Sequence, residues 1–466
     1  MEGEITVKRI LVMILSVMLF ASVLSAQNAL DAVRIVQDEM GFGTRALAMG
    51  GAYVALADDY TGIYWNPAGL AWMKRSQFWG EVSHLSFNNA ATFAGQLTDD
   101  SQNYTRLRSL GLAFPLPTRR GSFVVALGYN RVRDFDRNLL FAGINRRSNG
   151  LSFTVDDVEY AFDRDLFQRE EVSDEGGLNQ WAVGAGIAAS PNVTVGATLI
   201  VWDGNDDYEL SFFQEDRDHV YEGRIPLGGG EFTDFHSYER NRTLNTDYSG
   251  VGLKLGALFR VTPGMRLGAA VGIPTTFTVE ETFAENDLLI FDDGFEDAFE
   301  FPSGRFKYKV RTPFHFDGGL ALRNRYVTFA AGLRYRDWSQ TRFKVDDRLI
   351  DDPDFQALLE ENRILRQDFR ATVDYHLGGE VYLQGLKARL RGGYAVFPTP
   401  LENASDDLDK KFISLGISFV VDRYVTLDIT YLRGTWKQTS EDEFTPGGTL
   451  EEITAHKFLA GLSYRF

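Results

Sequence analysis

Short links and long acidic loops alternate along almost the whole chain, and this alternation constrains the fold more than any other feature. Stretches with strand character are joined by brief links at residues 116–120, 190–192, 262–264, 324–325, 384–385 and 422–423. Much longer polar segments lie between these links, at residues 136–177, 203–242, 284–303, 341–367, 398–410 and 438–452. A soluble β-sandwich gives no reason for every second connection to be long, whereas an outer-membrane barrel has short periplasmic turns and long outer loops.

The start of the chain predicts export from the cytoplasm. Residues 10–26 form the one long apolar run, which follows Lys8 and Arg9 and ends in small residues, so we interpret residues 1–26 as a signal peptide. The alternative is an uncleaved anchor, for which the run is short. A mean hydropathy of -0.20 is too polar for a bundle of membrane helices. The chain has no cysteine, so it forms no disulfide and carries no lipid anchor on cysteine.

The charge of the chain excludes one class of partner. The net charge is -17, and an acidic surface of this kind repels nucleic acid. Much of the acid lies in the expected outer loops, because residues 284–302 hold seven acidic side chains and no basic one.

The final strand shows the alternation that a barrel wall requires. Apolar side chains fall on one face and mostly polar ones on the other, with Leu459 as the exception. The apolar face holds Phe458, Ala460, Leu462, Tyr464 and Phe466, and the other face holds Lys457, Gly461, Ser463 and Arg465. Charged residues face the interior, because Arg or Lys at mid-bilayer costs ~2–4 kcal/mol. Small inward residues leave room for something inside the barrel. The terminal Phe466 resembles the signal that the barrel-assembly machinery reads; the alternative is the last strand of a soluble sheet.

We therefore expect an all-β fold, a transmembrane antiparallel barrel over residues 75–466 in the outer membrane of a Gram-negative-type bacterium. The expected strands number fourteen, at residues 76–87, 106–115, 121–135, 178–190, 193–203, 246–260, 265–282, 304–323, 326–340, 369–383, 386–397, 411–421, 424–437 and 453–466. An even number places both termini in the periplasm. Pro274 and Pro313 fall at similar heights in neighbouring strands, which predicts a bulge or local gap there.

Residues 27–74 precede the first strand and are rich in glycine and alanine, which suits a compact plug inside a confined lumen. The Gly-x-Gly-x-x-Ala pattern at residues 41–46 is no dinucleotide loop, because it lacks a preceding strand and a βαβ context.

This segment resembles the amino-terminal region of the FadL/TodX outer-membrane transport family over about thirty residues. The matching stretches are Gly50-Gly51-Ala52, Ala57-Asp58-Asp59 and Trp65-Asn66-Pro67-Ala68-Gly69-Leu70, whose Asn-Pro-Ala core resembles the family's hatch motif. PorV-type barrels, which serve protein secretion or surface attachment, share a very similar segment. The resemblance implies a hatch over residues 27–74 with Gly50, Gly51, Asp58, Asp59, Asn66, Pro67, Ala68 and Gly69 at the gate.

The resemblance also implies passive uptake of a hydrophobic small molecule, a long-chain fatty acid or an aromatic hydrocarbon. Ligand is expected to be captured among the outer loops, to pass an inner site and to leave sideways into outer-membrane lipid, through a gap beside a kinked third strand. Here the third strand has no proline and only Gly128 as a weak point, so the pair Pro274 and Pro313 is a rival position.

Two outer loops offer apolar surface to such a ligand. In one, Pro353 follows a candidate helix cap at Asp352, and Phe355, Leu358, Leu359 and Leu365 share a helical face. The other holds Leu288, Leu289, Ile290, Phe291, Phe295 and Phe299 among acidic residues. These side chains form either a capture groove or apolar faces that pack together to order the loops.

Three basic residues of one strand, Lys387, Arg389 and Arg391, are expected to face inward and could hold a carboxylate head group. The alternative is pairing with Asp317, Asp374, Glu380 or the hatch acids Asp58 and Asp59. His315 and His376 also fall on inward faces, where a lone histidine is usually a structural partner.

Catalytic motifs are missing from the sequence: it has no His-Glu-x-x-His, no Gly-x-Ser-x-Gly and no phosphate loop. A calcium-loop spacing that begins at Asp203 fails at its turn glycine and closing glutamate. We expect a channel that is not an enzyme and uses no cofactor or metal, with a PorV-type interaction barrel as the alternative. A membrane hydrolase lacks a convincing Ser–His pair.

Overall fold

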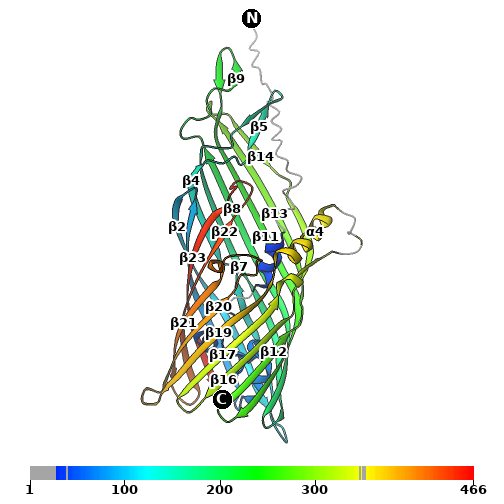
Figure 1. The fold of residues 1–466 in the computed structure, drawn as a ribbon, viewed down its shortest axis with the longest axis vertical. Helices are drawn as coiled ribbons and strands as arrows, with labels where there is room; N and C mark the ends of the chain where they lie inside the picture. Colours follow the sequence, from blue (N-terminus) through cyan, green and yellow to red (C-terminus); the bar gives the residue numbers. More distant parts are fainter. Residues whose placement is uncertain (1–27, 38–39, 346–347, 349–352) are drawn as a thin grey trace.

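The wall of the molecule is one closed antiparallel β-barrel (Figure 1). This computed structural model describes residues 28–37, 40–345, 348 and 353–466. Four of the wall strands are interrupted, so that eighteen segments form fourteen strands. β1 pairs with β23 from Gln77↔Arg465 to Thr92↔Leu450 and closes the cylinder. The expected fold class and strand number are confirmed.

Ten wall strands are continuous. They are β1 (Gln77–Phe93), β2 (Gln96–Leu116), β7 (Leu166–Ser190), β8 (Val193–Glu215), β11 (Phe235–Thr262), β19 (Ala371–Leu383), β20 (Ala388–Phe397), β21 (Lys410–Val420), β22 (Val425–Ser440) and β23 (Thr449–Arg465). The interrupted ones are β3 (Phe123–Asp134) with β4 (Arg137–Asn145), β12 (Met265–Gly272) with β13 (Thr276–Phe291), β16 (His315–Arg323) with β15 (Gly304–Arg311), and β17 (Val327–Asp337) with β18 (Arg342–Lys344).

Short elements fill the interior and the outer connections. The remaining strands are β5 (Ser152–Val155), β6 (Val158–Ala161), β9 (Ile225–Gly228), β10 (Glu231–Thr233) and β14 (Glu296–Glu300). The helices are α1 (Ala29–Val36), α2 (Thr44–Ala48), α3 (Gly62–Trp65), η1 (Pro67–Trp72), η2 (Trp338–Gln340), α4 (Pro353–Asp368), η4 (Gln384–Leu386) and η5 (Asp406–Leu408). No helix in the described part of the chain has the length and apolar character needed to cross a membrane.

The two prolines interrupt their strands as predicted. β12 ends at Gly272 before Pro274, and β15 ends at Arg311 before Pro313. The break is bridged, because the backbone N–H of Thr312 donates to the carbonyl of Thr275 at 2.8 Å. The backbone N–H of Thr275 in turn donates to the hydroxyl of Thr312 at 2.9 Å. The wall is therefore closed at the prolines.

The prediction that residues 136–177, 203–242 and 284–303 form loops is wrong over much of their length. β8 runs to Glu215, and the 28-residue β11 already begins at Phe235. A strand crosses a bilayer in about 9–11 residues, so these strands continue well beyond one.

The outward face of β8 explains the extension. Its exposed side chains change along the strand from the apolar Leu199 and Val201 to the polar Asp203 and Asn205 and the acidic Glu209. Period-two alternation continues, but above the apolar band the polar side chains face outward and apolar ones face the interior.

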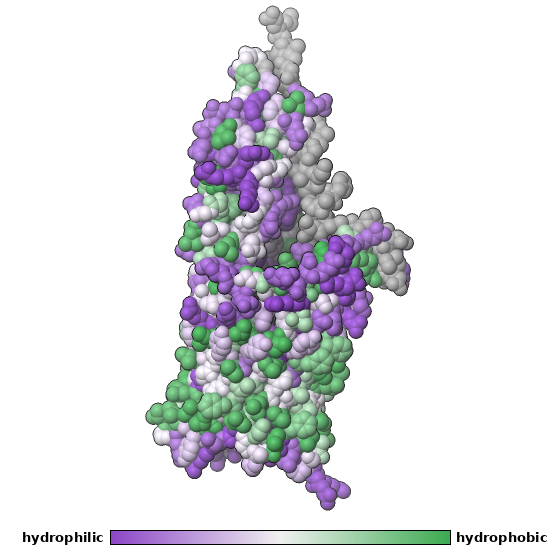
Figure 2. Space-filling model, in the orientation of Figure 1, coloured by the Kyte–Doolittle hydropathy of each residue, from purple (hydrophilic) through white to green (hydrophobic). Residues whose placement is uncertain are grey.

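Apolar side chains are exposed on the lower part of the wall, and Figure 2 shows them gathered there beneath a polar upper part. Leu199, Val251, Leu333, Leu377 and Leu415 lie on different strands and are all exposed. An exposed apolar surface of this extent needs a bilayer around it. The lower part of the barrel is therefore the membrane-spanning part.

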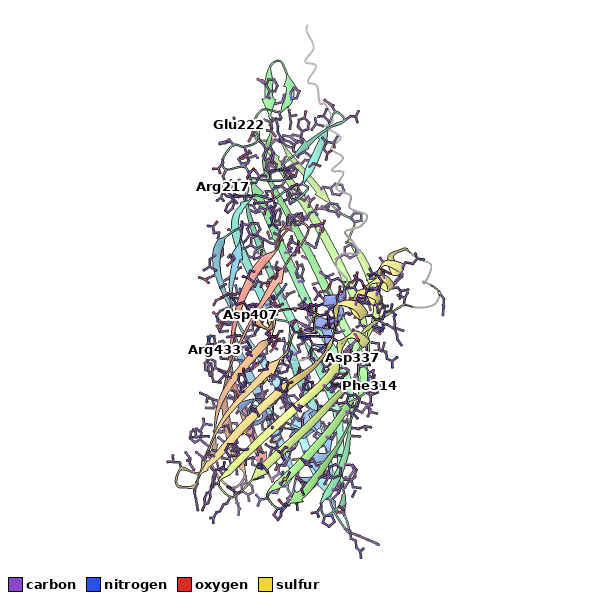
Figure 3. All side chains as sticks on the ribbon, in the orientation of Figure 1. Arg217, Glu222, Phe314, Asp337, Asp407 and Arg433 are labelled. Atoms are coloured by element: carbon purple, nitrogen blue, oxygen red, sulfur yellow. The ribbon has the colours of Figure 1, made fainter. Side chains whose placement is uncertain are left out.

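The wall is uneven in height. On one side the wall ends near Asp337, the last residue of β17, and near Asp407 of η5, which precedes β21. The opposite wall continues to the level of Arg217 and Glu222 (Figure 3). Helix α4 lies across the low side (Figure 1). The lumen is thus bordered by a tall wall of β7, β8, β11 and β13 and by a low wall.

The two ends of the described chain differ in position. Phe466 lies at the rim of short turns, where its N–H donates to the carbonyl of Ser76 at 3.0 Å. At the other end, the N–H of Ala29 donates to Glu361 of α4 at 2.8 Å. The expected signal peptide, residues 1–26, and the expected cap Asp352 lie outside the described residues. A periplasmic location of both termini stays a prediction.

Candidate functional site

Residues 40–73, called the inner segment below, lie inside the barrel and fill its lower lumen. The segment contains α2, α3 and η1, and almost all of its side chains are buried. Asn66 sets the turn into η1: its carboxamide oxygen accepts the N–H of Ala68 at 3.1 Å, and its backbone is extended. Pro67 suits the first helical position because its missing N–H would have had no helical partner. The Asn-Pro-Ala stretch is therefore a helix start.

Glycines on the inner wall let the segment approach the strands at backbone distance. A Cβ on Gly393 would lie 2.0 Å from the backbone nitrogen of Gly50, and one on Gly256 would lie 2.0 Å from the carboxamide oxygen of Asn66. Further inward glycines would collide with the segment in the same way; they are Gly111, Gly128, Gly184, Gly186, Gly196, Gly268, Gly378, Gly416 and Gly461. The prediction that small inward residues make room inside the barrel is confirmed.

Side chains of the wall also bind the backbone of the inner segment. Glu81 accepts the N–H of Thr44 at 2.6 Å, and the hydroxyl of Thr430 donates to the carbonyl of Thr44 at 2.8 Å. From other strands, Thr198 donates to the carbonyl of Ile63 at 2.8 Å, and His376 Nδ1 lies 2.8 Å from the carbonyl of Gly50. His376 is thus a structural partner, as expected.

The two predicted gate carboxylates have different partners. Asp58 pairs with Arg45 at 2.9 Å, with Arg266 at 3.1 Å and with Arg323 at 3.4 Å. Asp59 accepts the hydroxyl proton of Tyr53 at 2.5 Å. Asp58 therefore connects the inner segment to two wall strands, whereas Asp59 holds the segment together internally.

All eight predicted gate residues lie in this packed region. Gly50 touches the backbones of β19 and β20, and Gly51 lies against His376 and Trp65. A Cβ on Gly69 would lie 2.1 Å from the carbonyl oxygen of Ala57. Their role in gating stays a prediction. Their close packing against the wall gives that prediction a physical basis.

The three basic residues predicted to face inward do not act together. Arg391 is buried and pairs with Glu380 at 2.8 Å and Asp428 at 2.7 Å, in line with the charge-pairing alternative. Arg389 is half-buried, with its guanidinium 5.5 Å from the ring of Tyr382. The inward position of Lys387 was wrong: it is exposed, in a turn with φ of 49°. The turn breaks the alternation that the prediction continued through it.

The predicted apolar capture residues fall into two separate clusters. Phe291 is buried in a cluster near the outer end of the barrel and lies 5.9 Å from the ring of Phe295, which is 48% exposed. In the second cluster, Phe355 stacks on Phe306 at 4.8 Å and Leu358 is buried. Leu359 is half-buried on the same helix, α4. Packing explains Phe291 and Leu358, while Phe295 keeps surface for a ligand.

A small cavity lies inside the barrel beside the inner segment. Its lining combines apolar side chains such as Phe87, Phe412 and Trp436 with the charged Arg108 and Lys457. The free volume is ≈ 40 Å³, whereas a cavity that binds benzene measures about 150 Å³. A hydrophobic ligand can therefore enter this space only if the inner segment moves.

The backbone ladder between the second and third strands is interrupted, beside the strand where the resemblance implied a gap. The ladder between β2 and β3 ends at Ser109↔Asn130, and β3 is bulged between Arg131 and Arg133. Above that point, β2 pairs only with β1 and β4 only with β7, as far as the described residues show. We call this break in the ladder the β2–β3 gap. Gly128, the weak point that the sequence analysis identified, lies just below it.

Charged side chains cross the β2–β3 gap, and the inner segment borders it. Arg106 of β2 pairs with Asp136 at 2.8 Å and with Glu175 at 3.1 Å. The hydroxyl of Tyr60 donates to Asn130 at 3.0 Å, and Arg108 donates to the carbonyl of Gly41 at 2.7 Å. A movement of the inner segment would therefore change the lower edge of the gap.

The outer end of the lumen has its own apolar core. This outer core contains buried side chains from the tall strands and hairpins, including Phe153, Phe162, Phe212, Phe235, Tyr238 and Phe444. The rings of Phe162 and Phe235 stack at 4.5 Å, and those of Phe212 and Phe444 at 4.4 Å. The outer core closes the tall side, so the low side at α4 is the shorter way into the lumen.

Glu170 in the outer core predicts a dependence of stability on pH. Burial raises the pKa of Glu170 well above its ordinary value, and the neighbouring Asp442 raises it further. A carboxyl group whose pKa is higher in the folded than in the unfolded protein stabilises the folded state at low pH. This stabilisation is lost as the pH rises from the pKa of the unfolded state to the pKa of the folded state. We expect Glu170→Gln to slow proteolysis of the outer core severalfold at neutral pH. The difference from the wild type should shrink in acid; an equal difference at both pH values would contradict the assignment.

Comparisons with known proteins agree with this architecture. No family model matches the chain, and no curated protein matches it in sequence. The structure is similar to the Pseudomonas putida toluene transporter TodX, with a TM-score of 0.60 at 15% identity over 92% of this chain and 99% of that one. A FadL homologue of Pseudomonas aeruginosa gives 0.56 at 13% identity, covering 91% and 98%. The Ralstonia pickettii toluene transporter TbuX gives 0.51 at 18%, also covering 91% and 98%. At these identities the likeness establishes the fold.

Proposed function

We propose that this protein is an outer-membrane channel of the FadL/TodX type for passive uptake of hydrophobic compounds. The observation that carries the proposal is the pairing of a lumen blocked by the inner segment with a break in the backbone ladder of the wall beside it. Arg108 ties β2 to Gly41 at 2.7 Å, and Tyr60 reaches Asn130 at the base of the gap. The similar structures described as toluene transporters and a FadL homologue support the same reading.

The proposed path begins at the low side of the wall. The half-buried Phe355 and Leu359 of α4 offer apolar surface there, where a hydrophobic compound is captured from water. The compound then enters the lumen, and displacement of the inner segment enlarges the ≈ 40 Å³ cavity. It leaves through the β2–β3 gap into the bilayer, so that it never crosses the polar floor of the barrel.

Uptake by proteoliposomes tests the function directly. Vesicles with and without the protein are given radiolabelled toluene or oleate, and the rate of accumulation is compared. We expect faster uptake with the protein and saturation at high concentration. If neither compound entered faster with the protein than without it, the channel would be overturned. Co-purification with a secreted protein or translocon would then favour the PorV-type interaction barrel.

Photolabelling tests the exit route. Leu107 on β2 and Leu199 on β8 are 51% and 54% exposed on the outside of the wall, but only Leu107 lies beside the gap. We expect a diazirine-bearing hydrocarbon, supplied from outside, to label Leu107 before Leu199 and severalfold more strongly at early times. Simultaneous and equal labelling would show that the compound reached both residues through the bilayer. Adding the probe to the membrane phase is the control, and it should label both residues alike.

A further inference from the structure

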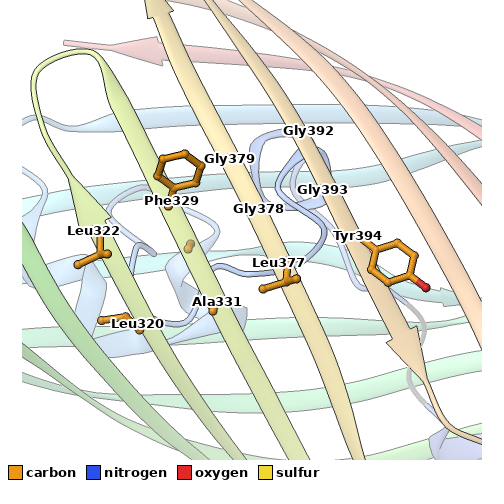
Figure 4. A pocket seen from close by; sticks show the side chains of 11 residues that line it. Leu320, Leu322, Phe329, Ala331, Leu377, Gly378, Gly379, Gly392, Gly393 and Tyr394 are labelled. Carbon is orange, nitrogen blue, oxygen red and sulfur yellow. The ribbon is translucent and has the colours of Figure 1, made fainter.

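A groove lies on the outer face of the barrel, away from the lumen and the gap. It has a volume of ≈ 520 Å³, within the range of about 300–1,000 Å³ that ligand pockets occupy. Its lining is almost wholly apolar and comes from β16, β17, β19 and β20 (Figure 4); the residues are Leu320, Leu322, Phe329, Ala330, Ala331, Leu377, Gly378, Gly379, Gly392, Gly393 and Tyr394. The groove faces the bilayer because it lies in the exposed apolar band.

Two paired glycines form the floor of the groove. Gly379 lies opposite Gly392 in the ladder, with Phe329 on one side and Leu415 on the other in the same row. A Cβ built on Gly392 would meet nothing closer than 3.8 Å, so the space above it is empty. Phe329 and Leu415 are 63% and 60% exposed and flank the two glycines in this row. The depression therefore results from missing side chains in an otherwise apolar row.

The turns below the groove are basic, in contrast to the chain as a whole. The short-turn rim holds seven basic residues and one acidic residue, although the net charge is -17; the basic ones are Lys74, Arg75, Arg119, Arg120, Arg325, Lys387 and Arg423. The single acid, Asp422, accepts the N–H groups of Tyr424 and Val425 at 2.6 and 2.8 Å. The rim therefore presents cationic charge on the periplasmic side.

Two of these cations lie on the turns that end the strands of the groove. Arg325 follows β16 and Lys387 follows β19, and both side chains are exposed. The turn that holds Arg325 touches the end of β19, because the N–H of Tyr382 donates to the carbonyl of Tyr326 at 2.7 Å. Within the part of the chain that the structure describes, neither cation is paired with a carboxylate. Tyr326, the exposed neighbour of Arg325, is of the residue type that is enriched at membrane interfaces.

We propose that this groove is a binding site for an anionic phospholipid of the inner leaflet. One acyl chain lies over Gly379 and Gly392, and the phosphate lies against Arg325 and Lys387. An apolar groove in the bilayer-facing wall fits a hydrocarbon chain, and cations at its lower end fit a negative head group. Clusters of basic residues beside a membrane recognise anionic lipids in this way. The proposal rests on the barrel being embedded in the outer membrane with the short turns in the periplasm.

Native mass spectrometry of the purified full-length protein tests the site. The protein is titrated with phosphatidylglycerol and, separately, with phosphatidylethanolamine of the same acyl chains. We expect one phosphatidylglycerol to be retained in preference. Each basic residue near a membrane surface contributes about fivefold to binding, so Arg325→Gln with Lys387→Gln should lower this preference about 30-fold. Gly392→Leu fills the groove and should remove retention of both lipids.

A matched pair of substitutions separates the site from general charge. Arg119→Gln with Arg120→Gln removes the same charge from the turn between β2 and β3, outside the groove, and should leave the preference unchanged. Equal loss in both double variants, or wild-type retention in Gly392→Leu, would overturn the site. Gly379→Leu, which fills the same space, serves if Gly392→Leu does not fold. Lipid retention is measured without a transported compound, so failed uptake with intact retention would overturn only the channel.

Discussion

Replacing Gly393 with alanine is expected to make the barrel conduct ions, whereas the same change at Gly392 leaves it closed. The two glycines are neighbours on β20 and face opposite sides of the wall. A Cβ on Gly393 would lie 2.0 Å from the nitrogen of Gly50 and 2.4 Å from the carbonyl carbon of Met49. Both are backbone atoms that cannot rotate away, so the inner segment itself must shift. Overpacking costs about 1–3 kcal/mol, which raises the displaced population about 5- to 150-fold.

Planar-bilayer recording measures this displacement. The fraction of time spent in conducting states is compared for the wild type, Gly393→Ala and Gly392→Ala, after heat-modified gel mobility has shown that each barrel is folded. Gly378→Ala should resemble Gly393→Ala, because its Cβ would lie 2.3 Å from the carbonyl oxygen of Met49. A silent Gly393→Ala barrel would mean that the inner segment does not seal the lumen. Conduction by Gly392→Ala would mean that the wall itself had been loosened.

The parts of the fold that could be predicted are those governed by local alternation. In β23, Phe458 and Leu462 face outward while Lys457 is buried inside, because a strand in a membrane must present opposite faces to lipid and lumen. The positions of the short turns were predicted from the same alternation, because each turn lies where one alternating stretch ends and the next begins. The inner segment could be recognised from its glycine and alanine content and from the Asn66-Pro67-Ala68 stretch, which resembles the hatch motif of the FadL/TodX family.

The height of the wall could not be predicted from apolar runs. Outside the membrane the preferred outward residue changes from apolar to polar, so Asp203 and Asn205 of β8 were taken for loop. The signal was present in the alternation, since Leu210 and Phe212 are buried while Glu209 and Ser211 are exposed. An alternation of inverted polarity after a membrane strand therefore indicates a wall that continues into water.

The resemblance implied a gap beside the third strand, but the residues of that strand did not by themselves predict the β2–β3 gap. The third strand lacks proline, and the ion pairs that span its break join residues that are far apart in the chain. Arg106 reaches Asp136 and Glu175, and Arg108 pairs with Asp134 at 2.6 Å. Asp134 also accepts a hydrogen bond from Lys457 at 2.7 Å, across 323 residues of sequence. Contacts of this range leave no pattern in the local sequence.

Replacing Arg240 with methionine is expected to open the outer core. The Arg240 side chain is fully buried, and its Nε and Nη2 donate to the two carboxylate oxygens of Asp287, each at 2.6 Å. It also pairs with Glu443 at 3.2 Å, which joins β11 and β13 to the connection between β22 and β23. Removing one partner of a buried ion pair costs about 3–5 kcal/mol, because the other charge stays buried without a counterion. Arg217, by contrast, pairs with Glu215 at the surface, where such pairs contribute about 0–1 kcal/mol.

Limited proteolysis of the protein in vesicles measures this opening, because cleavage tracks the population of the open form when reclosing is fast. We expect Arg240→Met to be cleaved at the outer end about 150- to 5,000-fold faster than the wild type. Arg217→Met should stay within about fivefold of it. Adding Asp287→Leu to Arg240→Met should restore much of the resistance, since Arg242 still pairs with Glu285 and Glu443. If the double variant were cleaved as fast as Arg240→Met, loss of packing rather than the unpaired Asp287 charge would open the outer core.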